Sequence, residues 1–141
     1  MILYLDTSSL VKLYVEEKGS GQVAEMVDRA EVSATSMIAY AEARAAFARR
    51  FREASISSKD YKKLRRGFAS DWQNFLSIHV TDALVRLAGN LAEKHRLRGF
   101  DAVHLASALT LKEKLATAIT FSCFDTVLQD ASRREQLTQP S

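Results

Sequence analysis

The chain contains 141 residues, of which 47% are hydrophobic and 26% are charged, and its formal net charge is +3. This length is typical of one domain with its own core, and this composition excludes a disordered chain. No apolar run approaches the ~20 residues that span a bilayer, and the single cysteine, Cys123, excludes an internal disulfide. We therefore expect a cytoplasmic protein without a membrane segment.

Short apolar runs alternate with stretches of helical periodicity along the chain. Several of the helical stretches follow a residue that can cap a helix. After the first apolar run, for example, Thr7, Ser8 and Ser9 offer side-chain oxygens that can cap the next helix. In chain order we expect a strand at 1–5, helices at 10–15 and 22–30, a strand at 32–34, helices at 36–51 and 59–75, a strand at 76–80, helices at 82–95 and from 101 onward, a strand at 116–121 and a helix at 124–131.

Strands separated by helices predict an α/β fold, in which a short parallel sheet is covered by helices on both faces. We expect residues 1–131 to form this domain. Residues 132–141 contain the only proline, Pro140, and are predicted to be a loose tail. In such folds, functional sites form at the carboxyl ends of the strands, where the helices begin.

The basic residues are concentrated in one segment. Between Arg44 and Arg66, nine Lys and Arg residues stand against Glu53 and Asp60, so this segment carries +7 and the rest of the chain carries −4. Such a block is typical of a surface that binds an anionic partner, most often nucleic acid, although a pair of solvated helix faces would look the same. The residues predicted to contact the phosphates of such a partner are Arg44, Arg49, Arg50, Lys62, Lys63, Arg65 and Arg66.

Four acids occupy positions where this fold would place a site. Asp6 follows the first strand, Asp101 opens an otherwise apolar helix, and Glu42 lies among apolar neighbours in the middle of a helix. Helix capping is the alternative explanation for Asp6 and Asp101, as it is for Asp125 before the last helix. For Glu42, the alternative is an ion pair with Arg49, two turns along the same face.

Three segments, each containing one of these acids, resemble a known family. They are Ile2–Tyr14, Ser36–Phe47 around Glu42, and Arg98–Ala106, and Thr120–Ala131 is similar to the last motif of the same family. The chain thereby resembles the PIN-domain ribonucleases, specifically the VapC toxins of bacterial toxin–antitoxin pairs. The resemblance covers almost the whole chain, with the motifs in the right order, and it implies a PIN-like α/β fold.

The resemblance also implies a metal site. Carried over position by position, the metal-binding acids of the family fall on Asp6, Glu42 and Asp101, and we place the fourth at Asp125. The chain departs from the family pattern here, because the slot two residues after Thr120 holds Ser122, whose hydroxyl could act through water. The hydroxyls of Thr7, Ser8 and Ser9 are expected to support Asp6 or a substrate phosphate.

The chemistry of these residues agrees with that implication. Carboxylates that converge without a cation repel one another and have raised pKa values, and an all-oxygen site favours Mg²⁺ or Mn²⁺. We therefore expect hydrolysis of RNA that leaves 5′-phosphate and 3′-hydroxyl ends, with Asp6, Glu42, Asp101 and Asp125 as the catalytic acids. His104, one turn after Asp101, either touches this site or is a satisfied core histidine.

The family resemblance implies two protein partners as well: a cognate antitoxin that covers the acidic cleft, and a second copy of the chain in a homodimer. The alternative function is a non-catalytic PIN-fold module that binds nucleic acid or a protein partner, for which the basic segment would suffice. A phosphatase of the haloacid dehalogenase kind is disfavoured, because it requires a second Asp where Ser8 stands.

Overall fold

A computed structural model describes residues 1–141. The elements follow one another in the order β1 (Ile2–Leu5), α1 (Thr7–Val11), α2 (Ser20–Arg29), β2 (Val32–Ser36), α3 (Ile38–Arg52), α4 (Ser58–Trp72), β3 (Leu76–Ile78), α5 (Asp82–His95), α6 (Gly99–Leu115), β4 (Ile119–Ser122) and α7 (Thr126–Arg134). The predicted alternation of strands and helices is confirmed, with element ends shifted by a few residues. No helix is both long and apolar enough to cross a membrane.

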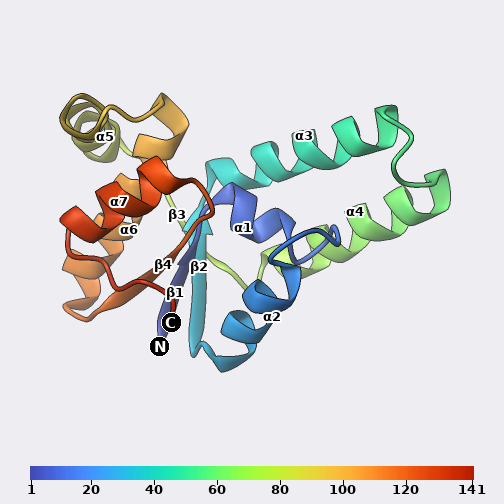
Figure 1. Ribbon diagram of the computed structural model, residues 1–141, viewed down its shortest axis with the longest axis horizontal. Coiled ribbons are helices and arrows are strands. Elements are labelled where there is room, and N and C mark those ends of the chain that lie inside the picture. The colour runs from blue at the N-terminus through green and yellow to red at the C-terminus, as the bar shows by residue number, and fades with distance from the viewer.

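The four strands form one parallel sheet in the order β3-β2-β1-β4. Helices cover both faces of this sheet, with α5, α6 and α7 on one side and α1 and α2 on the other (Figure 1). The predicted α/β fold, a short parallel sheet between helical layers, is therefore confirmed. Because β1 lies in the centre of the sheet, the turn that follows it, with Asp6, is surrounded by other elements.

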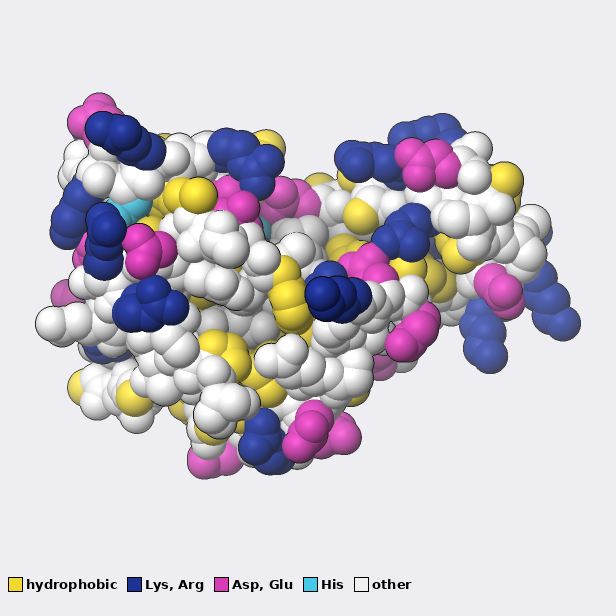
Figure 2. Space-filling view, viewed as in Figure 1, with side chains coloured by type: hydrophobic (Ala, Val, Ile, Leu, Met, Phe, Trp, Pro, Cys, Tyr) yellow, Lys and Arg dark blue, Asp and Glu magenta, His cyan; other side chains and the backbone are white.

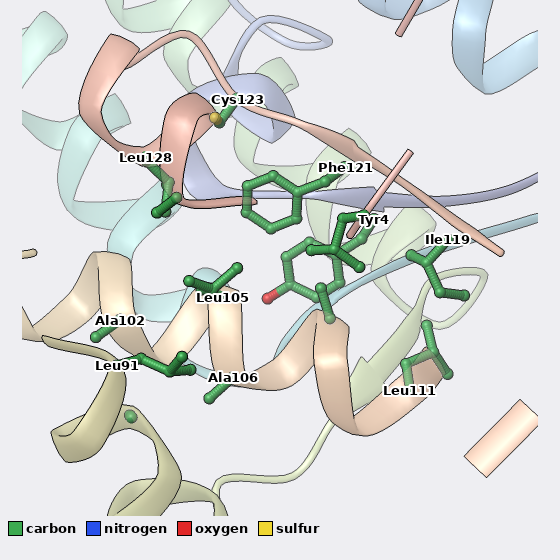
Figure 3. Packing of buried hydrophobic residues seen from close by; sticks show 14 of the residues in the cluster. Tyr4, Leu91, Ala102, Leu105, Ala106, Leu111, Ile119, Phe121, Cys123 and Leu128 are labelled. Carbon is green, nitrogen blue, oxygen red and sulfur yellow. The ribbon is translucent and has the colours of Figure 1, made fainter. Parts of the chain in front are cut away.

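The strand β1 contributes side chains to two separate cores. Tyr4 belongs to the core beneath α5, α6 and α7, whereas Leu3 and Leu5 belong to the core beneath α1, α2 and α3. This alternation follows from the two-residue period of a strand, whose successive side chains point to opposite faces. The ring of Tyr4 stacks on Phe121 of β4 at a centroid distance of 5.4 Å, facing α6 (Figure 3).

The helices α3 and α4 form a long hairpin that extends away from the sheet (Figure 1). Aromatic residues hold its base together, because Phe68 of α4 packs on Phe47 and Tyr40 of α3 at centroid distances of 5.4 and 5.3 Å. Near the tip, Phe51 stacks on Tyr61 at 4.6 Å. The hairpin carries the basic segment found in the sequence, and its aromatic side chains serve its own packing.

The prediction of a loose tail from residue 132 is wrong. The helix α7 continues to Arg134, Leu137 is buried in the core, and Thr138 lies alongside β4. The backbone N–H of Thr138 donates to the carbonyl of Ile119 at 2.9 Å, and that of Phe121 donates to the carbonyl of Thr138 at 2.9 Å. The physical reason is that β4 is an edge strand, whose free backbone groups need partners.

Candidate active site

Asp6 stands between β1 and α1, where it caps the helix. Its Oδ1 accepts hydrogen bonds from the backbone N–H of Ser9 at 2.9 Å and from the hydroxyl of Ser8 at 2.8 Å. The side chain is buried, and this burial raises the pKa of the carboxyl, an effect that nearby His104 and the bonds from Ser8 and Ser9 only partly offset. Capping and a place in a site are therefore compatible for Asp6, since its Oδ2 accepts no hydrogen bond from the protein.

Ser122 joins this turn from the end of β4. Its carbonyl accepts from the backbone N–H of Asp6 at 3.1 Å and from the hydroxyl of Ser9 at 2.9 Å. The two serine hydroxyls also lie 2.9 Å apart. Ser9 and Ser122 are both fully or almost fully buried, so the turn that carries Asp6 is fixed to the neighbouring strand.

Glu42 projects from α3 and is held through one oxygen. Its Oε1 accepts from the hydroxyl of Thr7 at 2.6 Å and lies 3.0 Å from Nε2 of His104. The alternative pairing with Arg49 is not formed, because Arg49 points to solvent. Burial by itself would raise the pKa of Glu42, but the hydrogen bonds from His104 and Thr7 and the charge of His104 together lower it.

The pKa shift of Glu42 corrects one expectation. Mutual repulsion of the acids predicts raised pKa values. The pKa of Asp6 is raised, but burial and not a neighbouring acid is the cause. Glu42 differs because a histidine stands against its carboxylate.

His104 both lies in the core and touches the site, so its two proposed roles coexist. It is 2% exposed, and its Nδ1 is 2.8 Å from the hydroxyl of Tyr4, which is fully buried. Tyr4 was not among the predicted site residues, because a tyrosine in an apolar strand resembles ordinary core. The sequence signal that could have found it is that its hydroxyl needs a buried partner.

Asp101 and Asp125 occupy the first turn of α6 and the cap of α7. One oxygen of Asp101, Oδ2, pairs with the guanidinium of Arg98 at 3.1 Å. The Oδ2 of Asp125 accepts from the backbone N–H of Leu128 at 2.9 Å, as the capping alternative predicts. Neither Oδ1 accepts a hydrogen bond from the protein.

The four acids fall into two groups that share Asp101. Glu42 and Asp101 line the same cavity of about 690 Å³. Burial raises the pKa of the Cys123 thiol, and so do the charges of Asp6, Asp125 and Asp101, which all lie near enough to act on it. Figure 2 shows acidic side chains beside the hollow between the two halves of the molecule. Asp101 therefore belongs to both groups, because it lines the cavity with Glu42 and acts on Cys123 together with Asp6 and Asp125.

The four acids match a divalent ion in chemistry but are not clustered around one point. As the side chains are arranged, no group of three or more His, Cys, Asp and Glu residues is close enough together to hold a metal ion. Each of the four acids nevertheless keeps one carboxylate oxygen without a protein donor: Asp6 Oδ2, Glu42 Oε2, Asp101 Oδ1 and Asp125 Oδ1. Anionic oxygens of this kind are the ligands that Mg²⁺ and Mn²⁺ prefer, so the residues fit such an ion chemically.

The basic segment divides into a groove and a separate ion pair. Four of its residues line a groove of about 350 Å³ between α3 and α4: Arg44, Lys62, Arg65 and Arg66. Arg50 is instead paired with Glu17, whose other oxygen accepts from Lys12 at 2.8 Å. Arg49 and Lys63 are exposed outside the groove.

Comparisons with known proteins agree with this architecture. The family model of the PIN domain matches residues 3–121. Two curated proteins from Mycobacterium tuberculosis, ribonuclease VapC45 of strain CDC 1551 / Oshkosh and ribonuclease VapC49 of strain ATCC 25618 / H37Rv, are each 36% identical to this chain over 110 residues. That alignment covers 78% of this chain and 76% of each relative.

Two crystal structures share the fold at low sequence identity. FitAcB from Neisseria gonorrhoeae superposes with a TM-score of 0.67 at 18% identity, over 100% of this chain and 97% of its own. VapBC2 from Rickettsia felis, bound to a DNA fragment from their promoter, superposes with a TM-score of 0.66 at 14% identity, over 99% and 97%. From the matched domain and the curated relatives together, this chain belongs to the PIN-domain family, among its VapC-type ribonucleases.

Proposed function

We propose that this chain is a divalent-metal-dependent endoribonuclease, the toxin of a toxin–antitoxin pair, which acts in the cytoplasm. It hydrolyses RNA phosphodiesters and leaves 5′-phosphate and 3′-hydroxyl ends. The observation that carries the proposal is the set of four carboxylates at the carboxyl edge of the sheet, each with one oxygen that no protein group occupies. Membership of the VapC-type ribonucleases supports the choice of RNA as substrate.

In this proposal the acids share the work of holding Mg²⁺ or Mn²⁺. Asp6 and Asp101 would be direct ligands, and Glu42 and Asp125 would bind the ion directly or through water. Such an ion, when bound, would lower the pKa of an attacking water and offset negative charge on the reacting phosphate. The hydroxyl of Ser8 orients Asp6, while Ser9 and Ser122 fix the turn on which Asp6 stands.

The groove between α3 and α4 supplies the RNA contacts. Arg44, Lys62, Arg65 and Arg66 line it, and phosphate contacts from such side chains give affinity that does not depend on sequence. Arg49 and Lys63 add positive charge beside the groove, whereas the charge of Arg50 is balanced by Glu17. Because α3 carries both Glu42 and Arg44, RNA held in the groove lies on the same rigid helix as one of the acids.

The cavity that contains Glu42 and Asp101 suits the antitoxin. Apolar side chains of α5 and α6 line its walls, including Phe100, which is 63% exposed. A partner segment with apolar side chains and one basic group would match this lining and place a cation beside the acids. The proposal also includes a homodimer, as the family resemblance implies.

A cleavage assay tests the proposed function. The purified chain is incubated with isolated tRNA and ribosomal RNA in Mg²⁺, in Mn²⁺ and in EDTA, and the new ends are identified by phosphatase and ligase treatment. We expect the parent chain to cleave RNA only when the metal is present. We expect Asp6→Asn and Asp101→Asn, with metal, to cleave no more than the parent does in EDTA. Asp130→Asn is the matched control, since Asp130 pairs with Arg133 and Arg134 on α7 outside the acidic region.

Two results would count against the proposal. Full cleavage by both Asp6→Asn and Asp101→Asn would show that these two acids take no part in the reaction. RNA binding that is unaffected by EDTA, without any cleavage, would instead favour the non-catalytic module that binds nucleic acid.

A further inference from the structure

A buried histidine and a buried tyrosine support one oxygen of Glu42. Nε2 of His104 lies 3.0 Å from Oε1 of Glu42, and Nδ1 of the same ring lies 2.8 Å from the hydroxyl of Tyr4. The hydroxyl of Thr7 is 2.6 Å from the same oxygen of Glu42 and 3.0 Å from Nε2. The residues of this chain of contacts come from β1, α1, α3 and α6, so only the folded protein assembles it.

Packing alone does not explain the polar atoms of Tyr4 and His104. The ring of Tyr4 stacks on Phe121 among Leu105 and other apolar residues, with its hydroxyl directed toward α6 (Figure 3). A phenylalanine would fill this space without a polar group, and burying a hydroxyl and an imidazole is costly unless both are hydrogen-bonded. Besides the hydroxyl of Tyr4, the ring of His104 contacts the carboxylate of Glu42 and the hydroxyl of Thr7.

The direction of each hydrogen bond follows from the donors available. The Thr7 hydroxyl donates its only proton to Glu42, so the Thr7 oxygen can accept from Nε2. Nε2 must carry a proton, because a bare nitrogen would face a carboxylate oxygen lone pair at 3.0 Å. In the neutral ring, Nδ1 then accepts from the Tyr4 hydroxyl, and in the charged ring it donates to it. Nε2 therefore donates to Glu42 in both charge states.

We propose that His104, oriented by Tyr4, is a positioning residue that fixes Oε1 of Glu42 and so keeps Oε2 available to the divalent ion. This inference rests on the proposed function, in which Glu42 takes part in holding that ion. Hydrogen-bonded partners of metal-binding carboxylates commonly change metal affinity or activity by about 10-fold to 100-fold when they are removed. His104 and Tyr4 would act on the ion only through Glu42.

The test measures Mn²⁺ affinity by calorimetry on RNA-free protein, together with kcat and KM for RNA cleavage. We expect His104→Leu to weaken Mn²⁺ binding by about 10-fold to 100-fold and to lower kcat with little change in KM. His104→Gln retains an N–H that can reach Glu42, so it should recover most of both quantities. Tyr4→Phe, which keeps the stacked ring and loses only the hydroxyl, should show a smaller loss and serves if His104→Leu does not fold.

The chain offers a matched control in His95. Its side chain is also buried, and its Nε2 lies 2.7 Å from Oε2 of Glu135, but this pair joins α5 to the end of α7 without involving any of the four acids. His95→Leu therefore removes a buried histidine–glutamate contact elsewhere. It should lower the unfolding temperature and leave Mn²⁺ affinity unchanged.

The outcomes separate this inference from the proposed function. If Glu42→Gln weakens Mn²⁺ binding and His104→Leu does not, the positioning role is wrong and the metal site stands. If His104→Gln loses as much affinity as His104→Leu, the histidine acts through packing and the inference is again overturned. If Glu42→Gln itself leaves Mn²⁺ affinity unchanged, the failure lies in the proposed site.

Discussion

The hydroxyl of Ser9 in α1 lies 2.9 Å from the hydroxyl of Ser122 at the end of β4, 113 positions further along the chain. Ser9 also donates to the carbonyl of Ser122 at 2.9 Å, and the backbone N–H of Asp6 donates to the same carbonyl at 3.1 Å. These contacts join the end of the central strand β1 to the end of the edge strand β4. The position of Asp6 therefore depends on a strand that is distant in sequence.

Removing the Ser9 hydroxyl should weaken the attachment of the Asp6 turn to Ser122. We expect Ser9→Ala to lower the free energy of unfolding by roughly 1–2 kcal/mol, because it leaves the buried Ser122 hydroxyl without its partner. Urea denaturation in EDTA measures this change. Ser55→Ala, which removes an exposed hydroxyl bonded to the Arg50 carbonyl, is the control and should stay within about 0.5 kcal/mol of the parent. Equal stability of Ser9→Ala and the parent would show that the contact between Ser9 and Ser122 contributes nothing to the free energy of unfolding.

The buried carboxylate of Asp6 should destabilise the metal-free protein at neutral pH. Its pKa is raised above the ordinary value of 3.8, mainly by burial, so the folded state favours the protonated form. Protonated Asp6 therefore stabilises the fold fully below the pKa that Asp6 has in the unfolded chain. This stabilisation is lost as pH rises through the pKa that Asp6 has in the folded protein. Asp6→Asn should thus be more stable than the parent at pH 7 in EDTA, and the difference should shrink as pH falls toward 4.

The pKa of Glu42 is shifted in the direction opposite to that of Asp6, so its effect on stability has the opposite dependence on pH. Its pKa is lowered from 4.5 because the bonds and charge of His104 and the bond of Thr7 outweigh burial, so its contribution is present above the unfolded pKa and lost as pH falls. Glu42→Gln should therefore be less stable than the parent at pH 7. Thermal unfolding of both variants between pH 3 and 7 checks the pair, and shifts of the same sign would contradict the assignment.

Divalent metal should offset the destabilisation that the buried Asp6 carboxylate causes in the metal-free protein. Mn²⁺ at about 100 times its Kd should stabilise the parent by about 2.7 kcal/mol, since it binds the folded state only. Asp6→Asn and Asp101→Asn should gain little, while Asp130→Asn should gain as much as the parent. Thermal unfolding with and without Mn²⁺ measures this difference. Equal stabilisation of all four proteins would place the ion elsewhere.

The groove between α3 and α4 should determine how RNA affinity depends on salt. For single-stranded RNA, each lost phosphate contact reduces the slope of log K against log salt concentration by about 0.7. Lys62→Gln, Arg65→Gln and Arg66→Gln should each weaken binding and flatten this slope, as measured by fluorescence anisotropy in EDTA. Arg29→Gln, at the exposed end of α2, is the control. An unchanged slope in the triple variant would exclude the groove from RNA binding.

The C-terminal segment should contribute to stability. Leu137 is buried beside β4, so Leu137→Ala should cost roughly 2–5 kcal/mol through lost burial and the cavity that remains. Deletion of the exposed Ser141 is the control and should have no effect. Urea denaturation compares the two, and a cost below about 0.5 kcal/mol for Leu137→Ala would show that the segment does not anchor the sheet edge.

The sequence by itself determined the layers of this protein and the places of its acids along the chain. Apolar runs alternate with helical patterns, which is enough to predict a parallel sheet between helices. Asp6 follows a strand and precedes a helix, so its position at the carboxyl edge also follows from local pattern. The basic character of the α3–α4 hairpin is likewise visible in the residue types of one continuous segment.

Only the tertiary structure decided which groups meet. Helical periodicity offered Arg49 as a partner for Glu42, but the partner is His104 of α6, 62 positions away in the chain. Composition suggested a loose end after residue 131, whereas the unpaired edge of β4 captures Thr138. Local pattern reflects the preferences of neighbouring residues, and contacts such as these depend on how whole elements pack, which no short segment encodes.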